Sequence, residues 1–142
     1  MIKICFVCTG NTCRSVMAER IMKKKLKESA IKDIKVSSRG IYASGENISD
    51  NAKQTLKNMK ISSANRKSVK LGKIDNNTLY VTMTEKQKSM LNCHNSLSFK
   101  SLLGYEIVDP YGQDMGVYTK VAKELESGVD ALLKKIKEWR KL

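Results

Sequence analysis

The sequence predicts a single α/β domain over residues 1–142, in which helices flank both faces of a four-stranded parallel sheet. Three observations lead to this prediction. The chain has 142 residues, the size of one compact domain with a substantial core. Strand-like apolar runs alternate with segments of helical periodicity from one end to the other, which is typical of parallel sheets with crossover helices. No internal repeat, low-complexity segment or linker interrupts the alternation.

Four apolar segments are predicted to form the strands of this sheet. The first leads from Ile2 to Val7 and is apolar enough to be buried on both faces. The second is short and ends at a polar turn that contains Gly40. In chain order, the strands are expected at residues 2–7, 34–36 and 79–83 and within residues 97–103.

Segments of helical periodicity separate these strands. The stretch Asn47-Ile48-Ser49 can cap a helix, and Thr84 followed by Glu85 is typical of a helix start. The last helix carries apolar residues at helical spacing between Tyr118 and Ile136. Helices are therefore expected from Arg14 or Ser15, after Ser49, from Thr84 to Leu91 and over 118–136, with loops at 60–77, which has room for one helical turn, and at 104–116.

Between the first strand and the first helix lies the stretch Cys8-Thr9-Gly10-Asn11-Thr12-Cys13-Arg14-Ser15. A strand, a tight loop and a helix in this order point backbone N–H groups and a helix N-terminus into one concavity, which is a site for an anion. Ligands of parallel α/β folds bind at the carboxyl ends of the strands, where this loop begins. The stretch is therefore predicted to bind phosphate, through Thr9, Gly10, Asn11, Thr12, Cys13 and Ser15.

Cys8 is the candidate nucleophile of this loop. It precedes a helix N-terminus, shares the loop with a cation, Arg14, and is placed to receive a hydrogen bond from Ser15, and these surroundings favour the thiolate. The guanidinium of Arg14 offers a planar fork of donors that matches two phosphoryl oxygens, in the ground state and in the transition state. Cys13 has two open interpretations, an inert thiol or a thiol that traps oxidised Cys8 as a disulfide.

A general acid is expected outside the loop, because the leaving group of a phosphoryl transfer needs a proton. The candidate is Asp109 in Val108-Asp109-Pro110-Tyr111-Gly112, where the proline stiffens the turn and Tyr111 offers a flat wall to a substrate. Alone, an Asp-Pro pair is typical of an ordinary turn. Together with the Cys8 loop, it predicts a carboxyl group that donates a proton and then acts as a base toward water.

The charge bounds the class of partner. The formal net charge is +13, from 27 Lys and Arg against 14 Asp and Glu. The lysines are spread along the chain with no arginine-rich or aromatic-rich cluster, which favours solvated basic faces over a nucleic-acid site. We expect phosphorylated proteins as partners, no nucleic acid, and a monomer.

Four cysteines, Cys5, Cys8, Cys13 and Cys93, do not resemble a secreted disulfide framework and lack paired metal-ligand spacing. Cys93 adjoins His94, but no second pair of ligands accompanies them, so a position at a helix end is expected and no metal site. No apolar run has the length of a membrane span, and no targeting segment is visible. A cytoplasmic protein without membrane association and without a cofactor is expected.

The order of these residues resembles the low-molecular-weight protein tyrosine phosphatases. Cys8 is followed by five residues, by Arg14-Ser15 and by Met17-Ala18-Glu19. The match continues, in the same order along the chain, through Ser38-Arg39-Gly40, Thr82-Met83-Thr84 and Asp109-Pro110-Tyr111-Gly112. The resemblance implies the four-stranded fold predicted above and a reaction in which Cys8 forms a phosphocysteine.

The same resemblance implies roles for the other residues. Asp109 would protonate the leaving group and then activate water, and Ser15 would stabilise the thiolate. Asn11 and Ser38 would belong to the hydrogen-bond network that supports the loop. Many members place a His in that network near the positions of Asn65 and Arg66, where this chain has none.

Thr12 bears on the substrate. Tyrosine-directed members usually carry a bulky aliphatic residue there, whereas the whole run from Cys8 to Ser15 resembles the protein arginine phosphatase branch. A hydroxyl at the pocket wall can hydrogen-bond a guanidinium or a water beside the phosphorus, and the smaller side chain changes the shape of the pocket. Phosphoarginine is therefore the favoured substrate, with a protein tyrosine phosphatase proper as the alternative.

Three further classes of protein fit the sequence less well. A thioredoxin-coupled arsenate reductase needs two further relay cysteines, and only Cys93 lies downstream of the loop. A sugar-transport phosphocarrier would need neither Arg14 nor Asp109. A non-catalytic module would use the loop only to dock a phosphate, and would bind in a salt-dependent way without hydrolysis.

Overall fold

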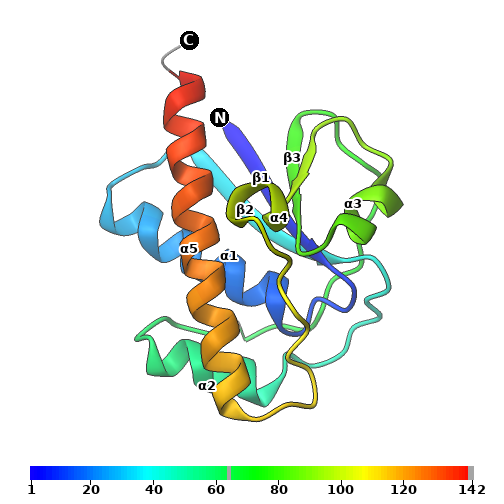
Figure 1. The fold of residues 1–142 in the computed structure, drawn as a ribbon, viewed down its shortest axis with the longest axis vertical. Helices are drawn as coiled ribbons and strands as arrows, with labels where there is room; N and C mark the ends of the chain where they lie inside the picture. Colours follow the sequence, from blue (N-terminus) through cyan, green and yellow to red (C-terminus); the bar gives the residue numbers. More distant parts are fainter. Residues whose placement is uncertain (64, 141–142) are drawn as a thin grey trace.

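The computed structural model describes residues 1–63 and 65–140, and within them a four-stranded parallel sheet with the order β2-β1-β3-β4 (Figure 1). The first two strands pair over their whole length, from Ile2 with Ile34 to Cys8 with Gly40. The strands are β1 (Ile2–Cys8), β2 (Ile34–Gly40), β3 (Thr78–Thr82) and β4 (Ser96–Ser98). This confirms the predicted fold class.

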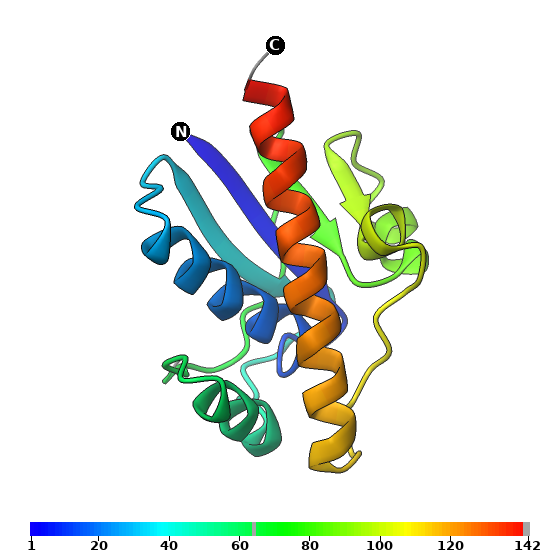
Figure 2. The same cartoon turned by 60° about the vertical axis from the view of Figure 1, so that its left-hand side comes forward.

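Within the described residues, five helices accompany the sheet. The long helix α5 runs along the length of the molecule and packs across α1 (Figure 2). The predicted helix starts are confirmed at Ser49, which caps its helix by accepting from the N–H of Ala52, and at Thr84, which forms a capping box with Gln87. The helices are α1 (Arg14–Glu28), α2 (Asp50–Asn58), α3 (Glu85–Leu91), α4 (Phe99–Leu103) and α5 (Met115–Arg140).

The larger core lies between the sheet and the layer of α1, α4 and α5. Phe6 of β1 stacks on Phe99 of α4, with ring centroids 6.0 Å apart. A Cβ on Gly128 of α5 would lie 2.1 Å from the Phe99 ring, so only glycine lets α5 approach this closely. A smaller cluster on the other face of the sheet joins Cys5 and Tyr80 to α3.

The fourth strand occupies only the beginning of the segment in which it was predicted. Within residues 97–103, only Leu97 and Ser98 belong to β4, which begins at Ser96, and the rest is the short helix α4. A brief apolar run does not distinguish strand from helix by its periodicity, and here Phe99, Leu102 and Leu103 pack into the core at helical spacing.

The second strand was predicted too short, because it continues beyond residue 36 through Ser37, Ser38 and Arg39 to Gly40. These polar residues still pair with β1, and the buried Ser38 enters the polar network described below. In the described part of 60–77 no helical turn forms; the chain instead bridges to residues 40 and 47. The last helix begins at Met115, inside the predicted 104–116 loop.

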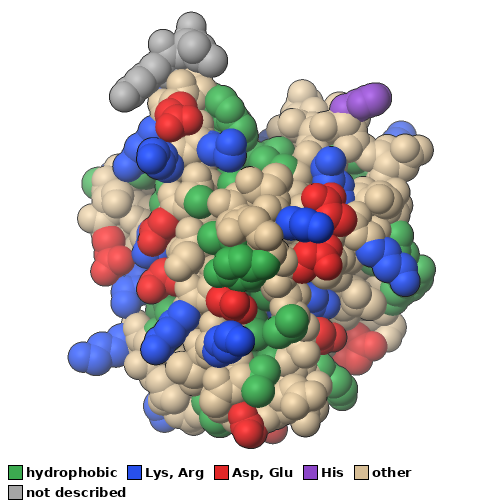
Figure 3. All heavy atoms as spheres, in the orientation of Figure 1, with side chains coloured by type: hydrophobic (Ala, Val, Ile, Leu, Met, Phe, Trp, Pro, Cys, Tyr) green, Lys and Arg blue, Asp and Glu red, His purple; other side chains and the backbone are tan. Residues whose placement is uncertain are grey.

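The pairing register of the strands brings the segments around the Cys8 loop to one end of the molecule. Cys8, Gly40 and Thr82 end their strands at the same edge of the sheet, because Cys8 pairs with Gly40 and Val7 with Thr82. The segments that follow these strands therefore share one end of the molecule, and Figure 2 shows the segment before α5 reaching the same end. On the face drawn in Figure 3, basic and acidic side chains are interspersed, which agrees with the solvated basic faces expected from the composition.

Candidate active site

The loop after β1 wraps around the Cys8 sulfur. Cys8 is 3% exposed, its Sγ accepts the backbone N–H of Asn11 at 3.2 Å, and the Ser15 Oγ lies 2.8 Å away. Asn11 adopts the left-handed conformation with φ of 55°, as expected of a residue that tolerates this geometry. A Cβ on Gly40 would lie 2.8 Å from the Asn11 nitrogen, so glycine is required where β2 passes the loop.

The first turn of α1 faces this loop without a cap of its own. Cys13 precedes the helix and makes no side-chain hydrogen bond to it, and among the described residues its first turn contains no acidic side chain. The N–H groups of a first turn carry partial positive charge and need acceptors. The arrangement suits a bound anion such as phosphate.

Arg14 joins the loop to the segment that carries Asp109. Its side chain is 7% exposed, its Nη1 donates to the carbonyl of Ile107 at 2.8 Å, and its Nη2 lies 3.8 Å from Asp109 Oδ2. The Asp109 carboxylate is also oriented by the N–H of Tyr111, which donates to Oδ1 at 3.1 Å. The acid candidate thus lies beside the guanidinium, with more than half of its side chain exposed.

These residues line one pocket of about 300 Å³. The loop forms one side of it, and Asp109 and Tyr111 lie on another, as predicted. Thr12 is part of the wall. The pocket is lined by Cys8, Thr9, Gly10, Asn11, Thr12, Cys13, Arg14, Glu46, Asn47, Asp109 and Tyr111.

Glu46 is a lining residue that sequence reasoning missed. The Ser44 hydroxyl, the Ser44 N–H and the Ser68 hydroxyl donate to its carboxylate and lower its pKa to about 2. It therefore stays ionised at neutral pH. Since Glu46 follows β2 at a distance of six residues, only the tertiary structure brings it to the Cys8 loop.

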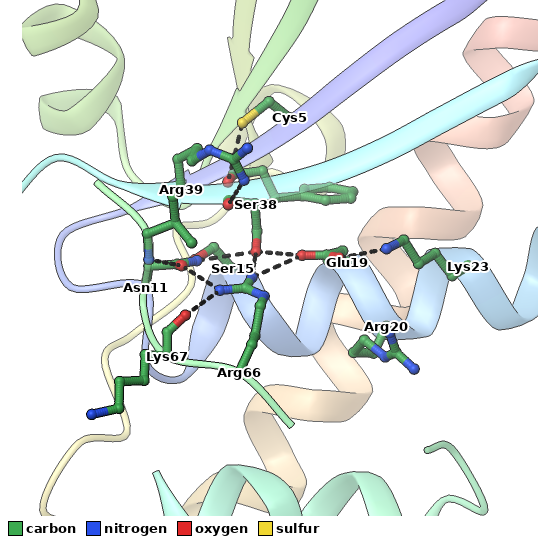
Figure 4. A network of polar contacts seen from close by, with 12 residues as sticks. Cys5, Asn11, Ser15, Glu19, Arg20, Lys23, Ser38, Arg39, Arg66 and Lys67 are labelled. Atoms are coloured by element: carbon green, nitrogen blue, oxygen red, sulfur yellow. Dashed lines mark hydrogen bonds and ion pairs between the residues drawn. The ribbon is translucent and has the colours of Figure 1, made fainter. Parts of the chain in front are cut away.

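A buried polar network supports the loop from behind (Figure 4). Asn11 Nδ2 donates to Ser15 Oγ at 2.8 Å and to Ser38 Oγ at 3.0 Å. Ser38 in turn donates to Glu19 Oε1 at 2.5 Å. The sequence predicted Asn11 and Ser38 as loop support, and the structure brings them together there; Ser15 and Ser38 lie behind the pocket, outside its lining.

Glu19 and Arg66 complete this network, and neither was singled out for it from the sequence. Arg66 Nη2 donates to Glu19 Oε1 at 3.1 Å and to Ser38 Oγ at 2.7 Å. Burial acts to raise the pKa of Glu19, but hydrogen bonds from Lys23 and Ser38 and the charges of Lys23 and Arg66 outweigh it, so the pKa lies below its usual range. An arginine thus occupies the network in the segment where the sequence showed that this chain lacks the histidine implied by the family resemblance.

Cys13 is turned into the protein. Its Sγ lies 3.2 Å from the Tyr118 hydroxyl, which is 2.9 Å from the Ser49 hydroxyl. Burial is the main cause that raises the pKa of Cys13, and burial likewise raises the pKa of Tyr118 to about 12. Cys13 therefore favours the thiol form, and all four cysteines are free.

The remaining thiols lie away from the pocket. Cys5 is buried on the other face of the sheet, and burial raises its pKa, as suits an inert structural thiol. Cys93 packs on that same cluster, one residue beyond the C-cap of α3 and next to His94. Among residues 1–63 and 65–140, no group of three or more His, Cys, Asp or Glu side chains could hold a metal ion.

The fold and the pocket define a class of protein: a single α/β domain with a loop suited to bind an anion at the carboxyl end of its first strand. The chain belongs to one family of this class, because residues 3–142 match the family described as low molecular weight phosphotyrosine protein phosphatase. The chain is therefore a protein phosphatase.

Two named relatives differ in substrate. A protein-arginine-phosphatase of Geobacillus stearothermophilus is 34% identical over 145 residues, 94% of this chain and 95% of the relative. The low molecular weight protein-tyrosine-phosphatase PtpB of Staphylococcus haemolyticus is 32% identical over 131 residues, 87% of this chain and 91% of the relative.

Solved structures agree with the fold. The YwlE arginine phosphatase of Geobacillus stearothermophilus superimposes with a TM-score of 0.85 at 31% identity, over 99% of this chain and 96% of that one. A YwlE mutant with a phosphorylated active-site serine has a TM-score of 0.86 at 28% identity, over 99% of both chains.

In residues 1–63 and 65–140, no helix has the length and apolar character needed to cross a membrane.

Proposed function

We propose that this phosphatase hydrolyses phosphoarginine in proteins through a phosphocysteine intermediate, and that it retains a lesser activity on phosphotyrosine. The observation that supports this most directly is the wall of the pocket, where Thr12 lies in the same lining as the Glu46 carboxylate and the Asp109 carboxyl group. A guanidinium is cationic and rich in donors. The Thr12 hydroxyl and the acidic groups of Glu46 and Asp109 accept hydrogen bonds, so this wall complements a guanidinium better than it complements a neutral phenol. The similarity to a protein-arginine-phosphatase points the same way.

In the first step, the Cys8 thiolate attacks the phosphorus, and the bond from sulfur to phosphorus forms as the bond from phosphorus to the arginine nitrogen breaks. Arg14 and the N–H groups of the loop stabilise the charge on the phosphoryl oxygens. The departing nitrogen keeps the electron pair of the broken bond and takes the proton of the Asp109 carboxyl group, so arginine leaves with its ordinary cationic guanidinium and Asp109 becomes a carboxylate. Ser15 and the N–H of Asn11 stabilise the thiolate before the attack.

In the second step, the Asp109 carboxylate removes a proton from a water molecule, which attacks the phosphocysteine. The new oxygen–phosphorus bond forms as the sulfur–phosphorus bond breaks, and phosphate leaves with Cys8 restored as thiolate. The phosphorylated active-site serine in the YwlE mutant supports a covalent route in that relative. A relay of the arsenate-reductase kind fits less well, because Cys93 packs on the cluster across the sheet and does not line the pocket.

The deciding experiment compares kcat/KM on a phosphoarginine protein and on a phosphotyrosine peptide, for the wild type and for Thr12→Ile. The wild type should prefer phosphoarginine. Thr12→Ile should move the ratio toward phosphotyrosine by about tenfold or more, because the hydroxyl is lost and the wall becomes apolar and bulkier. Thr119→Ile is the matched control, since Thr119 is exposed on α5 outside this pocket. A wild type that prefers phosphotyrosine, or a ratio that Thr12→Ile leaves unchanged, would contradict the assignment.

A further inference from the structure

The side chain of Arg66 reaches from the segment between α2 and β3 to the back of the Cys8 loop (Figure 4). Its Nη1 donates to Asn11 Oδ1 at 3.1 Å and to the carbonyl of Lys67 at 2.8 Å. Its Nη2 donates to Ser38 Oγ and to Glu19 Oε1. A guanidinium has only donors, so each of these four oxygens must act as an acceptor.

The first consequence concerns the side-chain amide of Asn11. Its Oδ1 receives Arg66 Nη1 and also the backbone N–H of Val69 at 2.9 Å. Both partners are obligate donors, so the amide oxygen must face them and the amide nitrogen must face the two serines, Ser15 and Ser38. The orientation of this amide is therefore dictated by the chemistry of its neighbours.

The second consequence concerns Ser15. Its Oγ accepts a hydrogen from Asn11 Nδ2, which leaves its single hydroxyl proton for the Cys8 sulfur at 2.8 Å. The sulfur therefore accepts from this hydroxyl, and it also accepts the N–H of Asn11. Two donors are therefore aimed at the sulfur, and both would hydrogen-bond a thiolate formed there.

Ser38 is held in the same sense. It accepts from Asn11 Nδ2 and from Arg66 Nη2, and its proton goes to Glu19 Oε1. Glu19 is the acceptor in which this branch ends, and its other oxygen pairs with Lys23 Nζ at 2.6 Å. The charged groups of the network are thus Glu19, Lys23 and Arg66, and the Arg39 guanidinium lies beside it, bonded to the Ser38 carbonyl.

We propose that Arg66 is a positioning residue for the nucleophile: paired with Glu19, it orients Asn11 so that Ser15 can only donate to the Cys8 sulfur. The inference rests on the proposed function in taking Cys8 as the nucleophile, but it does not depend on which phosphorylated residue is the substrate. Arg66 acts through Asn11 and Ser15 and is not among the residues that line the pocket.

The test replaces Arg66 by Met, which keeps an unbranched apolar stem and removes every donor. Two quantities are measured: the rate of Cys8 alkylation by iodoacetamide from pH 5 to pH 8, and kcat and KM for p-nitrophenyl phosphate. Arg66→Met should slow alkylation at pH 6 by about tenfold and move the alkylation curve to higher pH, since a charge-assisted hydrogen-bond network is lost. It should lower kcat by about tenfold or more and change KM by less than about threefold, and Arg66→Lys should recover part of both losses.

Arg20→Met is the matched control. Arg20 also ties α1 to the segment after α2, through the carbonyl and the hydroxyl of Ser62, and among the described residues none of its side-chain hydrogen bonds goes to the network. It should behave as wild type in both measurements. An equal shift in Arg20→Met would show that Arg66 merely anchors the segment, and would overturn the proposal.

The energetic coupling between Arg66 and Asn11 provides a second test of the proposal. If Arg66 acts through Asn11, the double variant Asn11→Ala with Arg66→Met should alkylate no more slowly than Asn11→Ala alone. Additive losses, or a wild-type alkylation curve in Arg66→Met, would overturn the inference. Should Arg66→Met fail to fold, Arg66→Gln serves with the same outcomes, because its one amide nitrogen cannot replace the four donations. Alkylation needs no substrate, so an unexpected substrate preference would refute the proposed function and leave this inference standing.

Discussion

The loop that carries Cys8 and the segment that carries Asp109 face the same pocket, but they are held in different ways. Cys8 and Arg14 are 3% and 6% exposed, and the loop is fixed by the polar network and by the approach of Gly40. Asp109 has a side chain that is 55% exposed, and Tyr111 is 69% exposed. Arg14 connects the two sides, through Ile107 and Asp109.

This difference fits the two roles proposed for Cys8 and Asp109. A nucleophile with bound phosphate needs donors that are already in place, because donors that must reorganise during the reaction lose much of their benefit. A general acid must reach a leaving group that belongs to a large protein substrate, so its carboxyl has to lie at the open side of the pocket. We therefore expect the buried Cys8 loop to determine whether the reaction occurs. The exposed segment with Asp109 should determine how fast the reaction runs and which substrate is used.

The largest expected effect is the loss of turnover in Cys8→Ser. Turnover of p-nitrophenyl phosphate should fall by at least about four orders of magnitude, because a serine hydroxyl in place of the thiolate is a weak nucleophile. The affinity of Cys8→Ser for inorganic phosphate, measured by displacement of a reporter ligand, should stay within a few-fold of the wild-type value, because the loop donors remain. Cys93→Ser, across the sheet, should keep full turnover. Near-normal turnover in Cys8→Ser would refute the role of Cys8.

Asp109→Asn tests the exposed side and should have the next largest effect. We expect kcat to fall by about 10²- to 10³-fold with a leaving group that needs protonation, such as phenol, and by less with p-nitrophenol. The control is Asp114→Asn, in the same segment, where Asp114 accepts the Val117 N–H at the start of α5. Equal losses on both leaving groups would move the acid to another residue.

Glu46→Gln tests how far the wall selects a cationic substrate. Because Glu46 is exposed to solvent, the effect should be modest, about three- to tenfold in kcat/KM on phosphoarginine and less than about twofold on p-nitrophenyl phosphate. The difference should shrink in 0.5 M NaCl. Glu138→Gln, an exposed carboxylate on α5 outside the pocket, should change neither. A loss that is the same for both substrates would mean that Glu46 only holds its own loop.

The smallest expected effect is on stability. Glu19→Gln should lower the free energy of unfolding at pH 7 by about 1–3 kcal/mol, because the buried partner of Arg66 loses its charge. The pKa of Glu19 is lower in the folded state than the ordinary value of 4.5, so this stabilisation is complete above about pH 4.5 and is lost as the pH falls through the folded value. Urea titrations should show a constant gap between wild type and variant from pH 8 to pH 5 and a narrowing gap below it.

Glu28→Gln, at the exposed end of the same helix, is the control for this titration. It should leave the stability nearly unchanged at every pH. A gap for Glu19→Gln that does not narrow in acid would mean that its charge contributes nothing to the network.

The sequence alone predicted most of the fold, because its signals are local. Alternating strand-like and helix-like periods identified the α/β class, and capping residues such as Ser49 and Thr84 marked helix starts. The errors lie where local signals conflict. The short run 97–103 fits the periodicity of a strand and of a helix, and the polar residues Ser37 to Gly40 are recognised as strand only once their pairing with β1 is known.

The candidate site divides in the same manner. Cys8, Arg14 and the loop between them are contiguous, so their spacing alone predicted a phosphate-binding loop, and Asp109 was predicted as the acid only from its Asp-Pro turn taken together with that loop. Glu19, Glu46 and Arg66 gave no such signal, because each looks like an ordinary surface charge in the sequence. Only the tertiary structure places Glu46 in the pocket wall and joins Arg66 to Asn11, 55 residues away, since the direction of a hydrogen-bond network depends on which donors and acceptors the folded chain brings within 3 Å.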